Sequence, residues 1–235
     1  MRISAVIVCH NSEDTIEKCL KSVMWADEIV VVDSLSTDRT VEICKRYTSR
    51  IFQEKWRGYI EQKNFALSKA SNDWVFCIDS DEEVSPRLKS SILKLKNLQS
   101  PPYNGYSMAR KVFYVGKWIR HSGWYPDYKI RLFNKNEGKW GGINPHDKVI
   151  LNGKAGRLNG DLHHYTYKNI GDHIDRLNLF SGVSAREMAK RDVRPSLIDI
   201  LLRPFFHILK IYFIKRGFMD GVRGLLIAVL GGVYV

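Results

Sequence analysis

The sequence predicts an α/β fold in which helices flank a mostly parallel sheet. Over about its first 95 residues, short apolar runs that fit buried strands alternate with segments whose apolar residues recur at helical spacing. Polar or acidic residues directly follow three of these apolar runs. Because parallel strands are joined by crossover connections, this alternation favours right-handed βαβ units and a parallel sheet.

The chain opens with a predicted strand, a helix and a second strand. Residues 3–8 form a largely β-branched run, which a His-Asn-Ser segment interrupts. From residue 12 to residue 23 the apolar side chains recur at helical spacing, and Ser12 offers capping chemistry at the start. Residues 28–33, Glu-Ile-Val-Val-Val-Asp, fit a second strand that ends in a carboxylate.

The next elements continue the alternation. Residues 40–47 predict a helix, residues 50–53 a short strand and residues 59–70 another helix. Residues 74–78, Trp-Val-Phe-Cys-Ile, form a fourth apolar strand. The Ser-Pro pair at 85–86 opens a further helix, because proline is favoured at the first helical position.

Beyond the two prolines at 101–102 the pattern becomes less regular. Residues 106–115, 129–134 and 148–151 fit strands, with glycine-bearing loops between them. This half is rich in Trp, Tyr and Gly. Because aromatic faces stack on sugar rings, its composition suits the binding of a saccharide that would act as an acceptor. The candidates for such stacking are Trp118, Trp124 and Trp140. The alternative is that each of them is an ordinary core or rim residue.

The most informative segment carries a cluster of carboxylates at the end of the fourth strand. Asp79, Asp81, Glu82 and Glu83 follow the apolar run directly. Like charges repel, and a divalent cation relieves that repulsion. Mg²⁺ and Mn²⁺ take oxygen ligands, and Mg²⁺ is commonly held by one or two carboxylates plus substrate phosphates. The alternative is an acidic turn before a helix, whose first turn favours Asp and Glu.

Polar residues also end the first two predicted strands. His10 and Asn11 follow the first strand, and Asp33 ends the second. Ligands of open α/β sheets bind outside the carboxyl ends of the strands, where this fold would gather these residues with Asp79 and Asp81. The convergence predicts a nucleotide site. No glycine-rich phosphate loop follows the first strand, so metal and basic residues are expected to bind the phosphates.

Composition narrows the possible partners. The net charge of +12 favours an acidic partner such as nucleic acid, anionic lipid or a phosphorylated substrate. No zinc-finger, homeodomain or RNA-binding signature accompanies the basic residues, so we expect no nucleic-acid partner. The four cysteines match no zinc pattern and are expected to be small buried hydrophobes. The N-terminus enters a strand at once, so no signal peptide is expected.

Several segments, in order, resemble the family 2 glycosyltransferases with the GT-A fold. They are residues 8–12, 28–40, 62–66 and 73–83. Residues 125–133, 146–147 and 162–167 narrow the likeness to lipopolysaccharide core-type glucosyltransferases of Gram-negative bacteria. The resemblance covers about residues 1–230 and implies a Rossmann-like, mostly parallel sheet flanked by helices.

The resemblance implies a role for each donor-side residue. Asp33 would hold the uracil or ribose of a UDP-sugar, and Asp79 would contact the ribose. Lys63, and with it Gln62, would lie near the base or the phosphates. Asp81 would bind the divalent metal, Mg²⁺ or Mn²⁺, that bridges the diphosphate.

Two further roles follow from the same resemblance. His164 would complete the metal or pyrophosphate site, with a buried, hydrogen-bonded histidine as the alternative. Asp147 is the candidate base for the acceptor hydroxyl, where related enzymes often carry Glu after His146. Asp127 is the alternative base, and Asp147 would then only cap a turn.

These roles imply an inverting, metal-dependent transferase. It would move a hexose, with glucose the expected sugar, from a UDP-sugar to a lipid-linked saccharide, expected to be the lipopolysaccharide inner core. Such transfer needs one base and positive charge at the leaving diphosphate. The alternatives are transfer to another lipid-linked glycan (capsule, O-antigen or glycoprotein precursor) or a non-catalytic, membrane-associated nucleotide-binding module. The donor sugar, acceptor hydroxyl, metal and oligomeric state stay open.

The C-terminal segment predicts membrane association. In residues 196–216, Asp199, Arg203, His207 and Lys210 follow at steps of four, four and three, which makes one polar stripe on an apolar helix. The charges disfavour a full span and favour a helix lying at anionic headgroups. The alternative is a helix packed on the catalytic domain or on a dimer partner.

We therefore expect residues 1–192 to be a GT-A catalytic domain and residues 193–235 to be amphipathic, membrane-associated helices. Within the catalytic domain, residues 1–100 would bind the nucleotide sugar and residues 101–192 the acceptor. The expected location is peripheral, on the cytoplasmic face of the bacterial inner membrane. The last apolar run, residues 224–235, has no polar finish, and the sequence leaves open whether the natural chain continues past Val235.

Overall fold

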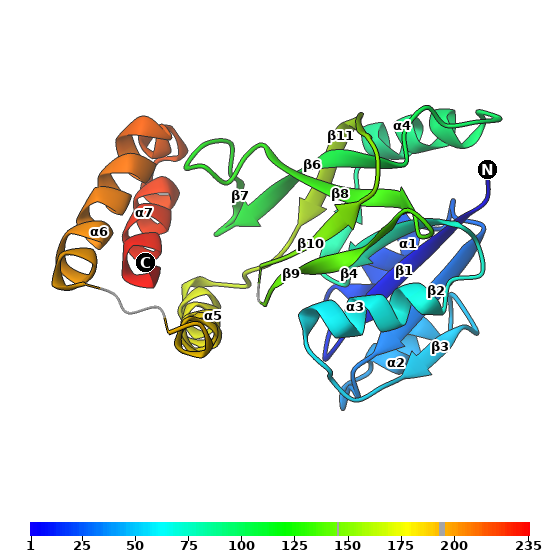
Figure 1. The fold of residues 1–235 in the computed structure, drawn as a ribbon, viewed down its shortest axis with the longest axis horizontal. Coiled ribbons are helices and arrows are strands. Elements are labelled where there is room, and N and C mark those ends of the chain that lie inside the picture. Colours follow the sequence, from blue (N-terminus) through cyan, green and yellow to red (C-terminus); the bar gives the residue numbers. More distant parts are fainter. Residues whose placement is uncertain (145, 193–195) are drawn as a thin grey trace. The chain divides into compact units, whose positions relative to one another are not determined.

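The computed structural model describes residues 1–144, 146–192 and 196–235, and the chain forms two compact units (Figure 1). The first unit comprises residues 1–110 and 128–164, and the second comprises residues 111–127 and 165–235. These units reflect contacts within the chain. The expected division into a catalytic domain, residues 1–192, and membrane-associated helices, residues 193–235, stays a prediction.

The main sheet has the strand order β3-β2-β1-β4-β8-β6-β11-β5. Its first four strands are parallel, whereas β8 runs antiparallel to β4 and β5 runs antiparallel to β11. The predicted mostly parallel sheet with flanking helices is therefore confirmed. Its strands are β1 (Ile3–Cys9), β2 (Glu28–Asp33), β3 (Ile51–Gln53), β4 (Trp74–Asp79), β5 (Glu82–Val84), β6 (Gly105–Tyr114), β8 (Asp127–Asn134) and β11 (Ala155–His164).

Three further strands complete the set in the described residues. β7 (Lys117–Trp118) pairs with β6, and β9 (Gly138–Ile143) pairs antiparallel with β10 (His146–Leu151) in a separate two-stranded sheet. The β9–β10 hairpin matters for the site, because it carries Asp147.

Alternating side chains of β1 divide the core of the first unit into two layers. Ile3, Ala5 and Ile7 pack in one buried cluster with residues of α1 (Ile16–Ser22), α2 (Thr40–Cys44) and α4 (Pro86–Lys96). Val6 belongs to the other cluster, which includes residues of α3 (Tyr59–Ser68) and Trp140 of β9. This alternation follows from the two-residue period of a strand. All four cysteines are free and buried, as expected.

The second unit combines helices with a small aromatic core. Val112, Tyr114, Ile119 and Ile227 form its buried cluster. The Asp220 carboxylate accepts hydrogen bonds from the Arg120 and His121 backbone N–H groups and from the Ser122 hydroxyl, which ties this loop to the helices. The helices are α5 (Ile170–Lys190), α6 (Leu197–Leu209), a π-helix (Lys210–Ile214), a 3₁₀ helix (Gly217–Asp220) and α7 (Val222–Tyr234).

Helix α6, all of whose residues the structure describes, has no buried side chain, although part of its C-terminal half is only partly exposed. Its sequence is strongly apolar. Ser196 caps its start, since the Ser196 hydroxyl accepts from the Asp199 N–H and the Asp199 carboxylate accepts from the Ser196 N–H. Across the described ranges, no helix combines the length and apolar character needed to span a bilayer.

Candidate active site

The carboxyl ends of the first, second and fourth strands meet at one edge of the sheet. Register sets this directly, because Cys9 of β1 aligns with Asp33 of β2, and Val8 aligns with Asp79 of β4. The predicted convergence of these polar strand ends is therefore confirmed. Two groups of residues occupy this edge. The first is held together by hydrogen bonds and has Asp33 as its charged residue, and the second is built from ion pairs.

The first group surrounds the loop that follows β2. Asp33 is fully buried, and its carboxylate accepts hydrogen bonds from the Ser36 N–H and hydroxyl. His10 Nδ1 lies 2.9 Å from the Ser34 carbonyl oxygen. The Asn11 side-chain oxygen accepts from the Thr37 N–H at 2.9 Å. The turns after β1 and β2 thus hold each other in place.

Gln62 belongs to the same group. It is fully buried on α3, and its side-chain amide donates to the Ser34 hydroxyl at 3.1 Å and to the Glu54 carbonyl at 3.3 Å. A buried amide needs such partners, because leaving it unpaired is costly. Gln62 therefore fixes the loop that positions Asp33.

The second group centres on a buried arginine. The Arg131 guanidinium donates to Asp79 at 2.7 Å and to Glu82 at 2.8 Å, and its side chain is only 4% exposed. Glu82 also accepts from the Asp79 N–H at 3.0 Å. Burial alone would raise the pKa of Asp79, but the charges of Arg131 and Lys63 outweigh it and hold that pKa well below its usual range. The Asp79 carboxyl group is therefore ionised at neutral pH.

Lys63 links this cluster to the predicted base. Its Nζ lies 3.1 Å from Asp79 and 2.9 Å from Asp147, so one ammonium is shared by two carboxylates. The same Nζ sits 4.4 Å from the centre of the Trp140 ring. Burial would lower the pKa of Lys63, yet the nearby Asp79 and Asp147 charges leave it raised. Trp140 itself is 5% exposed and packs as a core residue.

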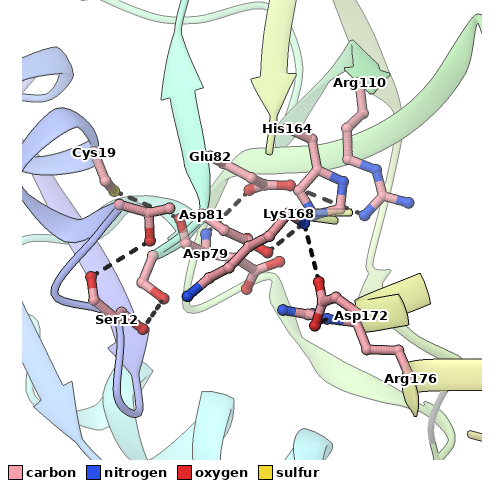
Figure 2. A network of polar contacts seen from close by, with 12 residues as sticks. Ser12, Cys19, Asp79, Asp81, Glu82, Arg110, His164, Lys168, Asp172 and Arg176 are labelled. Atoms are coloured by element: carbon pink, nitrogen blue, oxygen red, sulfur yellow. Dashed lines mark hydrogen bonds and ion pairs between the residues drawn. The ribbon is translucent and has the colours of Figure 1, made fainter. Parts of the chain in front are cut away.

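Asp81 and His164 form a pair beside this cluster (Figure 2). His164 Nε2 lies 3.4 Å from an Asp81 oxygen. The contact follows from strand pairing, since His164 of β11 stands opposite Glu82 of β5 in an antiparallel register. His164 Nδ1 is buried and has no hydrogen-bond partner among the described residues. No cluster of three or more His, Cys, Asp or Glu side chains suited to a metal occurs in the part of the chain that the structure describes.

A carboxylate and an imidazole suit a divalent cation that takes its remaining ligands from a substrate. Mg²⁺ commonly binds through one or two carboxylates plus phosphate oxygens, and imidazole adds affinity for Mn²⁺ or similar ions. An ion at this position would bind His164 through Nε2, because that is the ring nitrogen that faces Asp81. The Asp81 and His164 pair therefore fits the expected metal position.

Asp127, the alternative base, begins β8 and belongs to the second unit.

Arg131, on the same strand, was not predicted as a site residue. A signal existed, because Arg131 stands within the run Ile-Arg-Leu-Phe of a predicted strand, where a charged side chain on a buried face requires partners. Arg110 joins the same network, 4.0 Å from Glu82.

Comparison with known proteins identifies the family. The model of glycosyl transferase family 2 matches residues 4–152, which include the whole edge described above except His164. The chain belongs to this family. An uncharacterized glycosyltransferase of Rickettsia typhi is 32% identical over 234 residues, covering 95% of this chain and 80% of that protein.

One relative has a stated biological role. The lipopolysaccharide core biosynthesis glycosyltransferase LpsC of Rhizobium meliloti is 29% identical over 239 residues, covering 99% of this chain and 88% of LpsC. Among solved structures, S. aureus TarS 1–349 in complex with UDP-GlcNAc has a TM-score of 0.51 at 13% identity, covering 99% of this chain and 90% of that one. The structural likeness confirms the GT-A glycosyltransferase fold.

Proposed function

We propose that this glycosyltransferase moves a hexose, with glucose the expected sugar, from a UDP-sugar to a lipid-linked saccharide, with inversion at the anomeric carbon. The observation that carries the proposal is the array at the sheet edge, where Lys63 stands between Asp79 and Asp147. The name of LpsC supports the lipopolysaccharide inner core as the acceptor.

The nucleoside of the donor would lie against the first group of residues. His10, Asn11 and Asp33 surround one loop at the carboxyl ends of β1 and β2, where ligands of open α/β sheets bind. Gln62 supports that loop from α3. In this proposal the group recognises the uridine by its shape and hydrogen-bonding groups.

The diphosphate would lie near Asp81, His164 and the cations of the second group. Asp81 and His164 would hold Mg²⁺ or Mn²⁺, which when bound stabilises negative charge on the departing diphosphate. Lys63 and Arg131 would offset the carboxylates of this group, so that the diphosphate meets less negative charge there. Asp79 keeps both cations in position through its ion pairs.

Asp147 is the proposed base. As the acceptor oxygen forms its bond to the anomeric carbon, the hydroxyl proton passes to the Asp147 carboxylate, and UDP leaves with the electrons of the broken bond. Lys63 holds the Asp147 carboxylate at 2.9 Å and so orients it before the acceptor arrives. A second catalytic acid is unnecessary, because UDP is a good leaving group without protonation of a sugar oxygen, in contrast to glycoside hydrolysis.

A lipid-linked acceptor implies work at a membrane surface. In the second unit α6 exposes large apolar side chains, among them Leu197 at 77% and Leu201 at 71%. Monomeric soluble proteins rarely leave such contiguous apolar surface uncovered. Together with the net charge of +12, this supports peripheral binding to an anionic membrane, at the cytoplasmic face of the bacterial inner membrane.

A UDP-release screen tests the reaction. Purified protein would be given UDP-glucose, UDP-galactose or a UDP-N-acetylhexosamine, each with Mn²⁺, Mg²⁺ or EDTA. We expect metal-dependent release with UDP-glucose when deacylated lipopolysaccharide inner core is present. If UDP were released only in the presence of another lipid-linked glycan, that glycan would replace the lipopolysaccharide inner core as the proposed acceptor. If the protein failed to bind UDP at all, a non-catalytic module would be favoured.

A further inference from the structure

A groove along α6 combines basic and apolar side chains in a way that the catalytic site does not use. It encloses about 470 Å³ and lies within the second unit. Two stripes of the helix line it, one polar and one apolar. The lining residues are Ile198, Asp199, Leu202, Arg203, Phe206, His207, Lys210 and Val235.

Close approach of α6 and α7 builds one side of the groove. The two helices lie side by side (Figure 1), and glycines of α7 face α6 at the contact. A Cβ added at Gly231 would stand 3.1 Å from the His207 ring, and one at Gly232 would stand 2.6 Å from Ile208. The His207 imidazole is therefore held against α7, while residues on the outer side of α6 stay open to solvent.

The polar stripe carries a net positive charge, because it holds Arg203 and Lys210 against the single carboxylate of Asp199. Arg203 and Lys210 are exposed and form no ion pair among the residues that the structure describes. Asp199 is the acidic side chain of the lining, and its carboxylate already accepts hydrogen bonds from the Ser196 N–H and hydroxyl. Burial, then the charges of Lys210 and Arg203, lower the pKa of His207, which reflects the positive field.

The apolar stripe runs beside the charges. Ile198, Leu202 and Phe206 follow at steps of four and are 68%, 48% and 60% exposed. Residues four apart lie on the same face of a helix, so these three form one ridge along the groove. A ligand that satisfies both stripes needs an anionic group and a hydrocarbon chain in the same molecule.

We propose that this groove binds the phosphate of an anionic phospholipid, with an acyl chain lying along the apolar ridge. Arg203 and Lys210 contact the phosphate, and the ridge of Ile198, Leu202 and Phe206 contacts the chain. The proposal rests on the membrane placement in the proposed function and gives that placement a defined site. It differs from a general attraction of a basic protein to a negative surface, because it assigns the attraction to two named residues.

Vesicle co-sedimentation of the full chain tests the site. Phosphatidylcholine vesicles would be compared with phosphatidylcholine vesicles containing phosphatidylglycerol. The double variant Arg203→Gln/Lys210→Gln removes the two cations. The control Lys89→Gln/Lys94→Gln removes the same charge from exposed positions of α4. Both pairs are exposed, so the fold should persist, and circular dichroism would verify it.

We expect the wild-type chain to bind the anionic vesicles and the groove variant to bind them about 30-fold more weakly, with the α4 control within about twofold of wild type. Equal weakening in both variants would overturn the site in favour of net charge, while leaving the membrane placement standing. Failure of the wild-type chain to bind either vesicle would overturn the placement and the groove together, without bearing on UDP release.

A second variant and a soluble probe separate the two stripes. Leu202→Asn retains every charge, and we expect it to weaken binding to the anionic vesicles while the α4 control does not. Inorganic phosphate, titrated by calorimetry, is expected to bind far more weakly than the vesicles. Unchanged binding by Leu202→Asn, or phosphate binding as tight as vesicle binding, would contradict an amphiphilic ligand and indicate a site for soluble phosphate.

Discussion

At the scale of single residues, the site is organised by cations that stand between carboxylates. Lys63 joins Asp79 to Asp147, and Arg131 joins Asp79 to Glu82. Asp79 and Glu82 could be predicted from sequence as a cluster, because they follow an apolar strand, whereas Asp147 was indicated by the family resemblance alone. The pairing of Asp79 and Glu82 with Arg131 could not be predicted, because it depends on β8 lying next to β4, which joins residues far apart in the chain.

The base assignment can be tested by paired substitutions. Asp147→Asn removes the proposed proton acceptor while keeping its shape, so kcat should fall by about 10²–10⁴-fold with UDP binding retained. Asp127→Asn should leave kcat within about threefold of wild type under the same assignment. Initial-rate kinetics and UDP calorimetry check both variants. The reverse ranking would move the base to Asp127.

The Arg131 network predicts the response of stability to substitution and to acid. Arg131→Met leaves Asp79 and the buried Glu82 without their shared partner, which should cost about 3 kcal/mol of unfolding free energy at pH 7. The folded pKa of Asp79 lies below its unfolded value. Its contribution is therefore present above the unfolded pKa and is lost as pH falls toward the folded one.

Urea unfolding at neutral pH and near pH 3.5 provides the measurement. Wild type should lose more stability than Arg131→Met on acidification, because the variant lacks the charge that contributes most to the low pKa of Asp79. A variant that matches wild type in both stability and acid response would show that the network contributes little.

At the scale of elements, regular patterns were predicted well and irregular ones were not. Apart from β5, the strands and helices up to α4 follow their apolar periodicity, and Ser85 and Pro86 start α4 as expected, with the Ser85 hydroxyl accepting from the Leu88 N–H. Strand β5 consists of Glu82, Glu83 and Val84, a composition that no strand pattern suggests. It forms because β11 offers an antiparallel partner, and that pairing also brings His164 to Asp81.

Helix α7 depends on glycine at a close backbone contact. A Cβ added at Gly224 would stand 1.8 Å from the Gly217 carbonyl oxygen, so Gly224→Ala must displace backbone and should cost at least about 1–3 kcal/mol. A Cβ added at Gly182 on α5 would meet, outside the helix backbone and among the described residues, only the end of the Arg186 side chain, at 3.9 Å. Gly182→Ala should therefore be neutral or stabilise by up to about 1 kcal/mol. Thermal unfolding compares the two, and similar Tm values would contradict the packing described for α7.

At the scale of the whole molecule, the residues proposed for the reaction and the exposed apolar helix α6 belong to different units of the chain. The first unit carries the residues proposed for the donor site and Asp147, and the second carries α6 with its exposed apolar side chains. The sequence indicated both features, the first through strand ends and the second through a polar stripe on an apolar helix. It could not indicate the two-helix groove, because that depends on α7 packing against α6 through Gly231 and Gly232.

The proposed donor site at the sheet edge depends on a divalent metal held by Asp81. Calorimetric titration of UDP into wild type and Asp81→Asn, each with Mn²⁺ and with EDTA, tests it most directly. Wild type should bind UDP at least about tenfold more tightly with Mn²⁺, whereas Asp81→Asn should bind it weakly and equally under both conditions. If Asp81→Asn kept the full Mn²⁺ enhancement, Asp81 would not be the metal ligand of the donor site.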